Sequence, residues 1–211
     1  RARDAGILTV IDGAHAPGQL PLELSTLGAD LYTGNCHKWL LAPKGAGFLW
    51  VRPELQDSVE PLVVGWGEGG FQARYAWLGT HDPAAYLSVP AALSFLLEHD
   101  WDEVAARAHA ILTGALEGVA ALTGLPGVYP DPRSYRQMAV TPLPDVGDPE
   151  RFQRRLYDEY RVEIPVTRHE GRSYLRLSVQ GYTGEADLAA LLGALETLLA
   201  EAGRVPRENS G

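Results

Sequence analysis

Residues 28–51 read GADLYTGNCHKWLLAPKGAGFLWV. The runs at 30–33 and 46–51 predict two short strands, because apolar and aromatic residues bounded by turn formers are typical of strands. Between them lies a segment bounded by glycine and proline that carries Lys38 and Lys44, the two lysines of the chain. A lysine is by default a solvated surface residue. Its position between two apolar strands instead favours a functional role for this segment.

A further apolar run lies upstream at residues 7–11 and ends at Asp12 and Gly13. A continuous apolar run bounded by turn residues predicts a strand buried on both faces. Open α/β sheets place their ligand contacts at the carboxyl ends of strands. We therefore expect Asp12 and Lys38, which each follow a strand, to converge at one edge of a sheet. Taken alone, Asp12-Gly13 would more simply be a strand-ending turn.

The remaining pattern predicts an α/β part followed by a small α+β domain. A short helix is expected at 21–27, a glycine-rich loop at 63–79, and a helix at 82–99 that Pro90 bends or interrupts. The rest predicts helices at 102–122, 149–160 and 186–200, and strands at 137–141, 162–166 and 174–179, the last two antiparallel. We place a domain boundary inside 82–102, with domains at 1–90 and 91–203 and a polar tail at 204–211.

Composition narrows the classes of function. The net charge of -9 argues against nucleic-acid and anionic membrane partners, which need clustered Lys and Arg. The single cysteine, Cys36, excludes an internal disulfide and fits a reducing cytoplasm. No apolar run has the length of a membrane helix, so we expect a cytoplasmic protein. The chain opens at Arg1 within an expected helix-to-strand connection, and we interpret it as missing its beginning.

Two other motifs are weaker. Residues 65–70 (GWGEGG) match the spacing of a dinucleotide-binding turn. No clear amphipathic helix follows directly, and Glu68 would repel a pyrophosphate, so we reject a nicotinamide-dependent oxidoreductase. Cys36 and His37 could form a nucleophile pair, but adjacent residues of an extended segment point to opposite sides. The sequence has no zinc-ligand spacing, and no metal site is expected. Gly79-Thr80 could present a hydroxyl and an N–H to a phosphate.

Four segments together resemble a known family. They are DGAHAPGQ at 12–19, the quoted stretch at 28–51, WLGTHDPAAYLSVPAAL at 77–93 and YLRLSVQGY at 174–182. In this order they resemble class V aminotransferases of pyridoxal-phosphate (PLP) fold type I, and most of all isopenicillin-N-epimerase-like members. The resemblance spans residues 7–200. It implies that 1–90 is the lysine-bearing part of the PLP-binding large domain, mostly parallel sheet with helices, and that 91–203 is the small C-terminal α+β domain.

The resemblance also implies roles around the cofactor ring. Lys38 would hold PLP as a Schiff base and later move the α-proton of the substrate. Asp12 would pair with the protonated pyridine nitrogen, which keeps the ring an electron sink. His15 would lie beside the phenolic oxygen. A Schiff-base lysine needs its free amine, which burial and nearby cationic groups favour.

Further implied roles concern the phosphate and the substrate. His37 and Asn35 would approach the phosphate, and Thr80 would contact the phosphate of a partner subunit's cofactor, which implies a homodimer with a shared site. Arg176 would bind the α-carboxylate of an amino-acid substrate, because a guanidinium matches a carboxylate with two parallel hydrogen bonds. Arg176 could also be a cross-strand charge partner, since Arg168 and Arg172 are near in the sequence.

Several functions remain open at this point. Epimerisation, transamination and elimination on an amino acid share the same first proton abstraction, so the cofactor residues do not separate them. Persulfide chemistry is not expected, because cysteine desulfurases use a cysteine in the later region and no cysteine follows Cys36. A complete family member would carry roughly as many residues again before Arg1. An inactive remnant or interaction module that keeps the fold without PLP is a further alternative.

Overall fold

The computed structural model describes residues 1–77 and 79–202. The chain divides into two compact units, Arg1–Asp100 and Trp101–Gly211, and each is described by itself. This division falls inside the 82–102 stretch where the sequence placed a boundary. The tail predicted at 204–211 lies outside the described residues.

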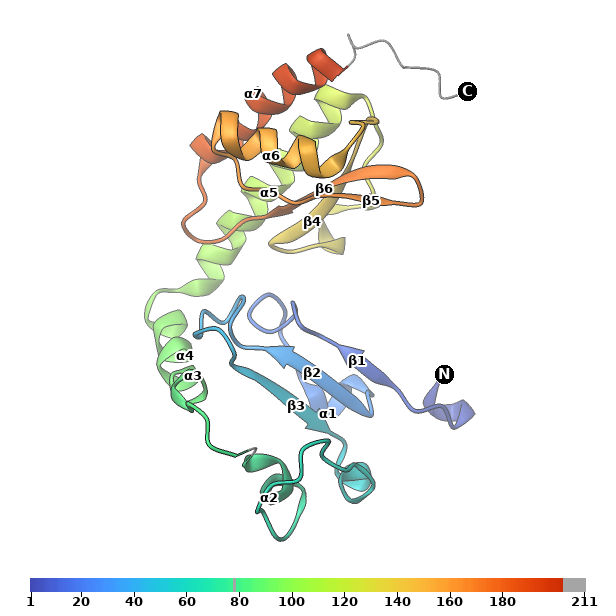
Figure 1. The fold of residues 1–211 in the computed structure, drawn as a ribbon, viewed down its shortest axis with the longest axis vertical. Helices are drawn as coiled ribbons and strands as arrows, with labels where there is room; N and C mark the ends of the chain where they lie inside the picture. The colour runs from blue at the N-terminus through green and yellow to red at the C-terminus, as the bar shows by residue number, and fades with distance from the viewer. Residues whose placement is uncertain (78, 203–211) are drawn as a thin grey trace. The chain divides into compact units, whose positions relative to one another are not determined.

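The first unit is built on a three-stranded sheet of order β1-β2-β3 (Figure 1). Strand β1 (Val10–Asp12) pairs with β2 (Leu31–Asn35) in parallel, and β2 pairs with β3 (Gly47–Val51) in antiparallel. The described sheet is therefore mixed, whereas a mostly parallel sheet was expected. Because β1 and β2 run in the same direction, their carboxyl ends meet at one edge, as predicted from the sequence.

Strand β1 is not the doubly buried strand that its apolar sequence predicts. All three of its residues are exposed, and Val10 keeps 65% of its surface. Ile7 and Leu8, just before it, are each 59% exposed. The prediction of burial is wrong for this structure, because β1 lies at the edge of the described sheet and no described element packs over it.

The helices of the first unit are short. Pro90 stands in the first turn of α4, where its missing N–H costs no helical hydrogen bond, and the predicted helix accordingly splits at Ser88. One helix was missed within the predicted loop, where Phe71 and Tyr75 bring their rings to 4.7 Å. The helical elements are η1 (Arg3–Ala5), α1 (Leu24–Leu27), η2 (Pro53–Ser58), α2 (Phe71–Ala76), α3 (Ala84–Leu87) and α4 (Val89–Glu98).

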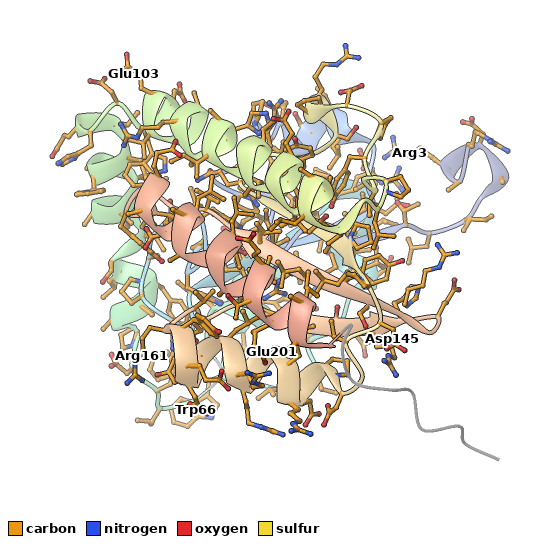
Figure 2. All side chains as sticks on the ribbon, turned by 90° about the horizontal axis from the view of Figure 1, so that it is seen from above. Arg3, Trp66, Glu103, Asp145, Arg161 and Glu201 are labelled. Carbon is orange, nitrogen blue, oxygen red and sulfur yellow. The ribbon has the colours of Figure 1, made fainter. Side chains whose placement is uncertain are left out.

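The second unit is an α+β domain, as expected, and its antiparallel sheet has the order β4-β6-β5. The expected antiparallel strand pair is present, but its first strand lies at 166–169 and not at the predicted 162–166. Its core lies between the sheet and three helices, and Leu112, Leu156 and Leu195 are fully buried there. Figure 2 shows these helices with Glu103 on α5 and Glu201 on α7. The elements are α5 (Trp101–Thr123), η3 (Pro132–Ser134), β4 (Met138–Leu143), α6 (Pro149–Tyr160), β5 (Val166–His169), β6 (Arg172–Ser178) and α7 (Glu185–Ala202).

The helix predicted at 149–160 is confirmed, with a physical reason at each end. The Asp148 carboxylate accepts hydrogen bonds from the N–H groups of Glu150 and Arg151 at 2.9 and 3.3 Å, which caps the first turn. Pro149 occupies the position where proline suits a helix. Arg161 ends the helix in the left-handed conformation, with φ at 60°.

Alternation along β6 decides which of its side chains meet the core. Ser173, Leu175 and Leu177 are buried, whereas Arg172 and Arg176 are exposed on the opposite face. The helices cover the face that carries the leucines, which leaves the arginines on the uncovered face within this unit. Among the described residues, no helix is long and apolar enough to cross a membrane.

Candidate functional site

Lys38 lies in a tight turn between β2 and β3. The Cys36 N–H donates to the Ala46 carbonyl at 3.0 Å, and the Ala42 N–H donates back to the Cys36 carbonyl at 3.0 Å. These two bonds close the segment into a compact loop. Leu41 adopts a left-handed conformation with φ at 62°, which costs a residue with a Cβ of the order of 1 kcal/mol. The turn is therefore held in a conformation that the free chain would rarely adopt.

Apolar packing fixes the base of this turn. Cys36, Ala42 and Ala46 are buried together, and Ala85 and Val89 of the α3–α4 region pack against them. Burial raises the pKa of the Cys36 thiol, which favours the protonated form over the reactive thiolate. Cys36 therefore belongs to the packing of the lysine turn.

The Lys38 amine lies beside an imidazole from the β1 side. Lys38 Nζ is 3.1 Å from His15 Nε2, and the Trp39 indole N–H donates to His15 Nδ1 at 3.2 Å. Lys38 and His15 are both half-buried, and Trp39 is buried. Residues 23 positions apart thus meet at the amine.

Glycines let the His15 loop approach the lysine turn this closely. A Cβ on Gly18 would stand 2.6 Å from the carbonyl of Trp39, and a Cβ on Gly13 would overlap the Tyr32 hydroxyl. Gly18 also has φ at +86°, a conformation that other residues rarely adopt. The two contacts mean that residues 13–18 lie directly on β2 and on the Trp39 backbone.

Asp12 stands at the carboxyl end of β1, in register with Thr33 of β2. Its carboxylate is exposed and accepts a hydrogen bond from the Ala14 N–H at 2.9 Å. The pKa of the neighbouring Tyr32 is raised, first by burial and then by the negative charge of Asp12. The turn interpretation of Asp12-Gly13 is thus correct as local structure, and the carboxylate still lies at the expected sheet edge.

Asn35 and His37 form a second small cluster. His37 Nδ1 lies 2.8 Å from the Ala46 carbonyl, and because a carbonyl only accepts, Nδ1 carries the hydrogen. The Asn35 amide nitrogen is 3.4 Å from His37 Nε2. Both side chains come from the end of β2 and the start of the lysine turn, shortly before Lys38 in the sequence.

The structure does not join the other two predicted residues to this cluster. Thr80 is exposed in the segment before α3, and no hydrogen bond between described residues links it to Lys38 or His15. Arg176 belongs to the second unit, where it lies opposite Val140 of β4. No ion pair among residues 1–77 and 79–202 includes Arg176, whereas Arg168 pairs with Asp145 at 3.1 Å.

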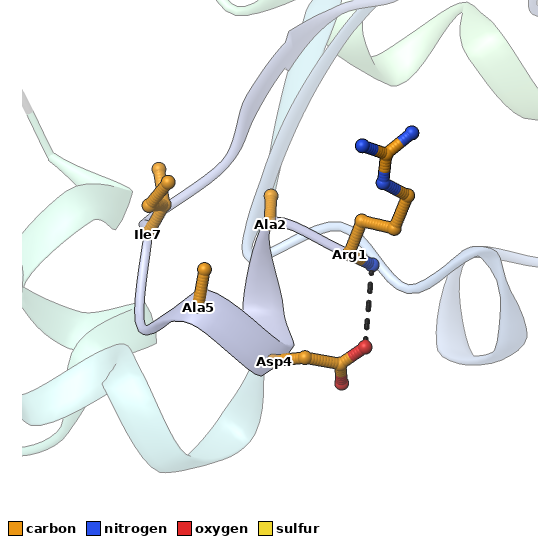
Figure 3. A pocket seen from close by; sticks show the side chains of 5 residues that line it. All are labelled: Arg1, Ala2, Asp4, Ala5 and Ile7. Atoms are coloured by element: carbon orange, nitrogen blue, oxygen red, sulfur yellow. Dashed lines mark ion pairs between the residues drawn. The ribbon is translucent and has the colours of Figure 1, made fainter.

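Two hollows elsewhere on the described residues lack a cluster of functional side chains like the one around Lys38. Figure 3 shows a shallow hollow beside the N-terminus, where the Arg1 amino group and Asp4 form an exposed ion pair at 3.5 Å. A groove on the second unit is lined by residues of 125–128, the end of β4 and the β5–β6 turn. No group of three or more potential metal ligands occurs among the described residues.

Sequence reasoning missed the residues that hold β1 beside β2. Asp30 is 2% exposed and accepts hydrogen bonds from the Thr9 N–H at 2.8 Å and the Thr9 hydroxyl at 3.0 Å. Arg52, just after β3, reaches the same carboxylate at 3.0 Å, and Arg3 approaches it at 3.8 Å. These interactions lower the pKa of Asp30, and the hydrogen bond from the Thr9 N–H makes the largest contribution.

Trp39 was missed as well, and its only signal in the sequence is its place next to Lys38.

A lysine amine between two strands, with a carboxylate and an imidazole at and after the end of the neighbouring parallel strand, fits one class of protein. It is the class of α/β enzymes that attach a carbonyl cofactor to a lysine. Comparison with known proteins gives the particular family: the chain belongs to the class V aminotransferases, whose family model matches residues 1–191.

Individual relatives agree with this family. The chain is 34% identical to an isopenicillin N epimerase of Streptomyces clavuligerus over 95% of its own length and 55% of that protein. It is 28% identical to a putative L-cysteine desulfhydrase of Oryza sativa, over 94% of the chain and 47% of the relative. A cysteine desulfurase structure from Thermococcus onnurineus superposes with a TM-score of 0.77 at 20% identity, over 95% of this chain and 54% of that one. The chain thus spans about half the length of these relatives.

Members of this family depend on PLP. The residues present fit that cofactor chemically. Lys38 offers an amine, Asp12 offers a carboxylate at the same sheet edge, and His15 lies 3.1 Å from the amine. The turn around Lys38 is packed at its base and partly shielded from water, which suits a residue that must bind a carbonyl carbon.

The Asp30 cluster generates a test of how the site edge is held. Asp30→Asn keeps the shape of the side chain and removes its charge, so we expect a less stable first unit at pH 7. A carboxyl group whose pKa is lowered by folding stabilises the fold above its ordinary value of 3.8 and loses that contribution as the pH falls through its folded value. The stability difference between the natural chain and the variant should therefore shrink below about pH 4.

Urea unfolding followed by circular dichroism from pH 7 to pH 3 measures this difference. Asp57→Asn, which removes an exposed carboxylate of η2, is the matched control and should leave the unfolding curve nearly unchanged. An Asp30→Asn curve equal to that of the control at pH 7 would contradict the role given to this cluster.

Proposed function

We propose that this chain forms the lysine-bearing part of a PLP-dependent enzyme that abstracts the α-proton of an amino acid, as an epimerase or aminotransferase of class V. The observation that carries the proposal is the half-buried Lys38 amine, 3.1 Å from His15, in a turn that folding holds in a strained conformation. Family membership supports the cofactor. The isopenicillin N epimerase relatives, at 34% and 33% identity, support the reaction type.

In this proposal, each residue of the sheet edge holds one part of the cofactor. Lys38 makes the covalent link, and Asp12 faces the ring nitrogen, where a carboxylate favours the protonated form. His15 lies at the phenolic oxygen. Asn35 and His37 contact the phosphate, as their joint position at the start of the lysine turn supports.

The chemistry divides between cofactor and chain. When bound, PLP withdraws electrons from the bond to be broken at the α-carbon. Lys38 Nζ would be the base that accepts the α-proton of the substrate. The hydrogen-bonded and packed turn holds the backbone of Lys38 in place, which is the contribution of orientation to the rate. Delivery of the proton to another carbon would give transamination, whereas epimerisation would need a second proton donor on the opposite face of the α-carbon.

Arg176 is proposed to bind the α-carboxylate of the substrate. Its guanidinium is exposed on β6, and no ion pair within the described ranges occupies it. This observation disfavours the alternative that Arg176 is a cross-strand charge partner. An arginine offers a carboxylate two parallel hydrogen bonds, so it would fix the orientation of an amino acid as well as its affinity.

A PLP-dependent amino-acid lyase is the second candidate. It is favoured by relatives that are named L-cysteine desulfhydrases, one of which is 28% identical over 94% of the chain. The same proton abstraction at Lys38 would begin that reaction. A persulfide route through this chain is disfavoured, because its only cysteine, Cys36, is buried in the lysine turn with a raised pKa.

We further propose a homodimer in a reducing cytoplasm, with Thr80 contacting the phosphate of the partner subunit's cofactor. The segment before Thr80 exposes apolar side chains: Leu62 is fully exposed, and Val64 and Trp66 (Figure 2) keep 89% and 91% of their surface. Contact with a second copy would remove this apolar surface from water. The single free thiol suits a reducing compartment.

The first test is covalent capture of the cofactor. The chain is mixed with PLP, reduced with borohydride and mapped by mass spectrometry. Because the chain has two lysines, the label can be assigned without ambiguity between Lys38 and Lys44. We expect the label on Lys38, its loss in Lys38→Ala, and full labelling in the matched control Lys44→Ala, since Lys44 is exposed.

The same capture is repeated with the part of the S. clavuligerus relative that the chain does not match joined to the chain, since the chain spans 55% of that protein. A fusion that is folded by circular dichroism but takes equal label on both lysines, or none, would overturn the proposal. It would favour a remnant that keeps the fold without the cofactor.

The second test concerns the substrate. Arg176→Gln should leave Lys38 labelling unchanged and weaken amino-acid binding by roughly 10- to 100-fold, as expected for loss of a hydrogen bond to a charged group. Binding is measured by titrating the cofactor absorbance with a set of amino acids. Arg172→Gln is the control, since Arg172 lies on the same strand and face. Equal effects of the two changes would count against a specific role for Arg176.

The third test concerns the oligomer. Sedimentation equilibrium of the chain with PLP should give twice the mass of one chain. Trp66→Ser should shift the equilibrium toward monomer, because it removes a large exposed apolar side chain. A monomer at all concentrations would contradict the proposed dimer while leaving the role of Lys38 intact.

A further inference from the structure

The indole of Trp39 fixes what His15 can offer to Lys38. An indole N–H can only donate a hydrogen bond, and it donates to His15 Nδ1 at 3.2 Å. Nδ1 must therefore present its lone pair. A neutral imidazole carries its single hydrogen on the other nitrogen, so this contact places that hydrogen on Nε2.

Nε2 is the atom that faces the amine. Lys38 Nζ lies 3.1 Å from it, at hydrogen-bond distance. An ammonium group has three donors and no acceptor, and it cannot bond to an N–H. The contact is a hydrogen bond only when Lys38 is a free amine that accepts from His15. The free amine is also the form that attacks a carbonyl carbon.

Packing gives this arrangement a defined position. Trp39 is 6% exposed, so its ring has little room to turn. Gly18 brings the His15 loop against the Trp39 backbone, where a Cβ would be 2.6 Å from the carbonyl. The Gln19 amide donates to the His15 carbonyl at 2.6 Å and ties the same loop to itself. The donor and its acceptor therefore come from two segments that are packed on each other.

We propose that Trp39 is a positioning residue of the lysine site: its indole N–H holds His15 in the tautomer that carries hydrogen on Nε2. His15 then presents a donor toward Lys38 Nζ and toward a group bound there. A donor at this position stabilises an oxyanion and the free amine, whereas a lone pair would stabilise an ammonium group. The inference deepens the proposed function and rests on it for its catalytic meaning, but the tautomer itself can be measured without cofactor.

The primary experiment reads the tautomer directly. The chain is labelled with ¹⁵N-histidine and ¹⁵N-tryptophan, and long-range nitrogen–proton spectra are recorded at a pH where His15 is neutral. His15→Gln identifies the signals of this ring among the six histidines. We expect the natural chain to show a protonated Nε2 and an unprotonated Nδ1, with a coupling across the hydrogen bond from the Trp39 indole nitrogen.

Trp39→Phe removes the N–H and keeps most of the ring volume. We expect both His15 nitrogen shifts to move toward the average of two exchanging tautomers. We also expect PLP capture at Lys38 to slow roughly five- to tenfold, as for loss of one hydrogen bond in a site. Trp50→Phe, the same change on β3, is the matched control. It should alter neither the nitrogen shifts of His15 nor the rate of PLP capture at Lys38.

The outcomes separate the two proposals. A natural chain with hydrogen on His15 Nδ1, or a Trp39→Phe variant that keeps a single tautomer, overturns the inference. If Trp39→Phe does not fold, the coupling in the natural chain decides alone, and its absence counts against the hydrogen bond. A correct tautomer together with a folded fusion that takes no label at Lys38 rejects the proposed function and leaves the positioning of His15 established.

Discussion

The buried carboxylate of Asp30 is the interaction on which the site depends. It stands just before β2 and binds both the backbone and the side chain of Thr9, just before β1, while Arg52 approaches from the end of β3. In a pair of parallel strands, the register at the start of the strands also fixes the register at their ends. The Asp30 carboxylate therefore also sets Asp12 opposite Thr33. The ladder between β1 and β2 joins only three residue pairs, and side-chain bonds outside it are needed to keep its register.

Much of this could be read from the sequence where local rules decide the structure. The lysine turn between two strands, the shared edge at which β1 and β2 end, and the helix at 149–160 follow from turn residues, strand order and periodicity. The burial of β1 could not be predicted, because it depends on what packs over the strand. Helix α2 was missed since glycines on its amino-terminal side predicted a loop, whereas the ring contact of Phe71 and Tyr75 supports a helix.

In the candidate site too, some residues could be predicted from local sequence motifs and others could not. Lys38, Asp12, His15, Asn35 and His37 were chosen by motif, and the structure gathers them around the carboxyl ends of β1 and β2. Trp39 and Asp30 carry no motif, because their roles are hydrogen bonds to residues distant in the sequence. Thr80 and Arg176 stay predictions, since their proposed contacts are with a partner subunit and with a substrate.

The open edge of β1 has a consequence for how the chain behaves in solution. An edge strand with exposed valine and isoleucine is a template for pairing with strands of other molecules, and so a starting point for aggregation. The net charge of -9 opposes such encounters at long range. Salt shortens the reach of this repulsion to about 8 Å at physiological ionic strength. Colloidal stability of the chain should therefore be a balance between one uncovered strand and the ionic strength around it.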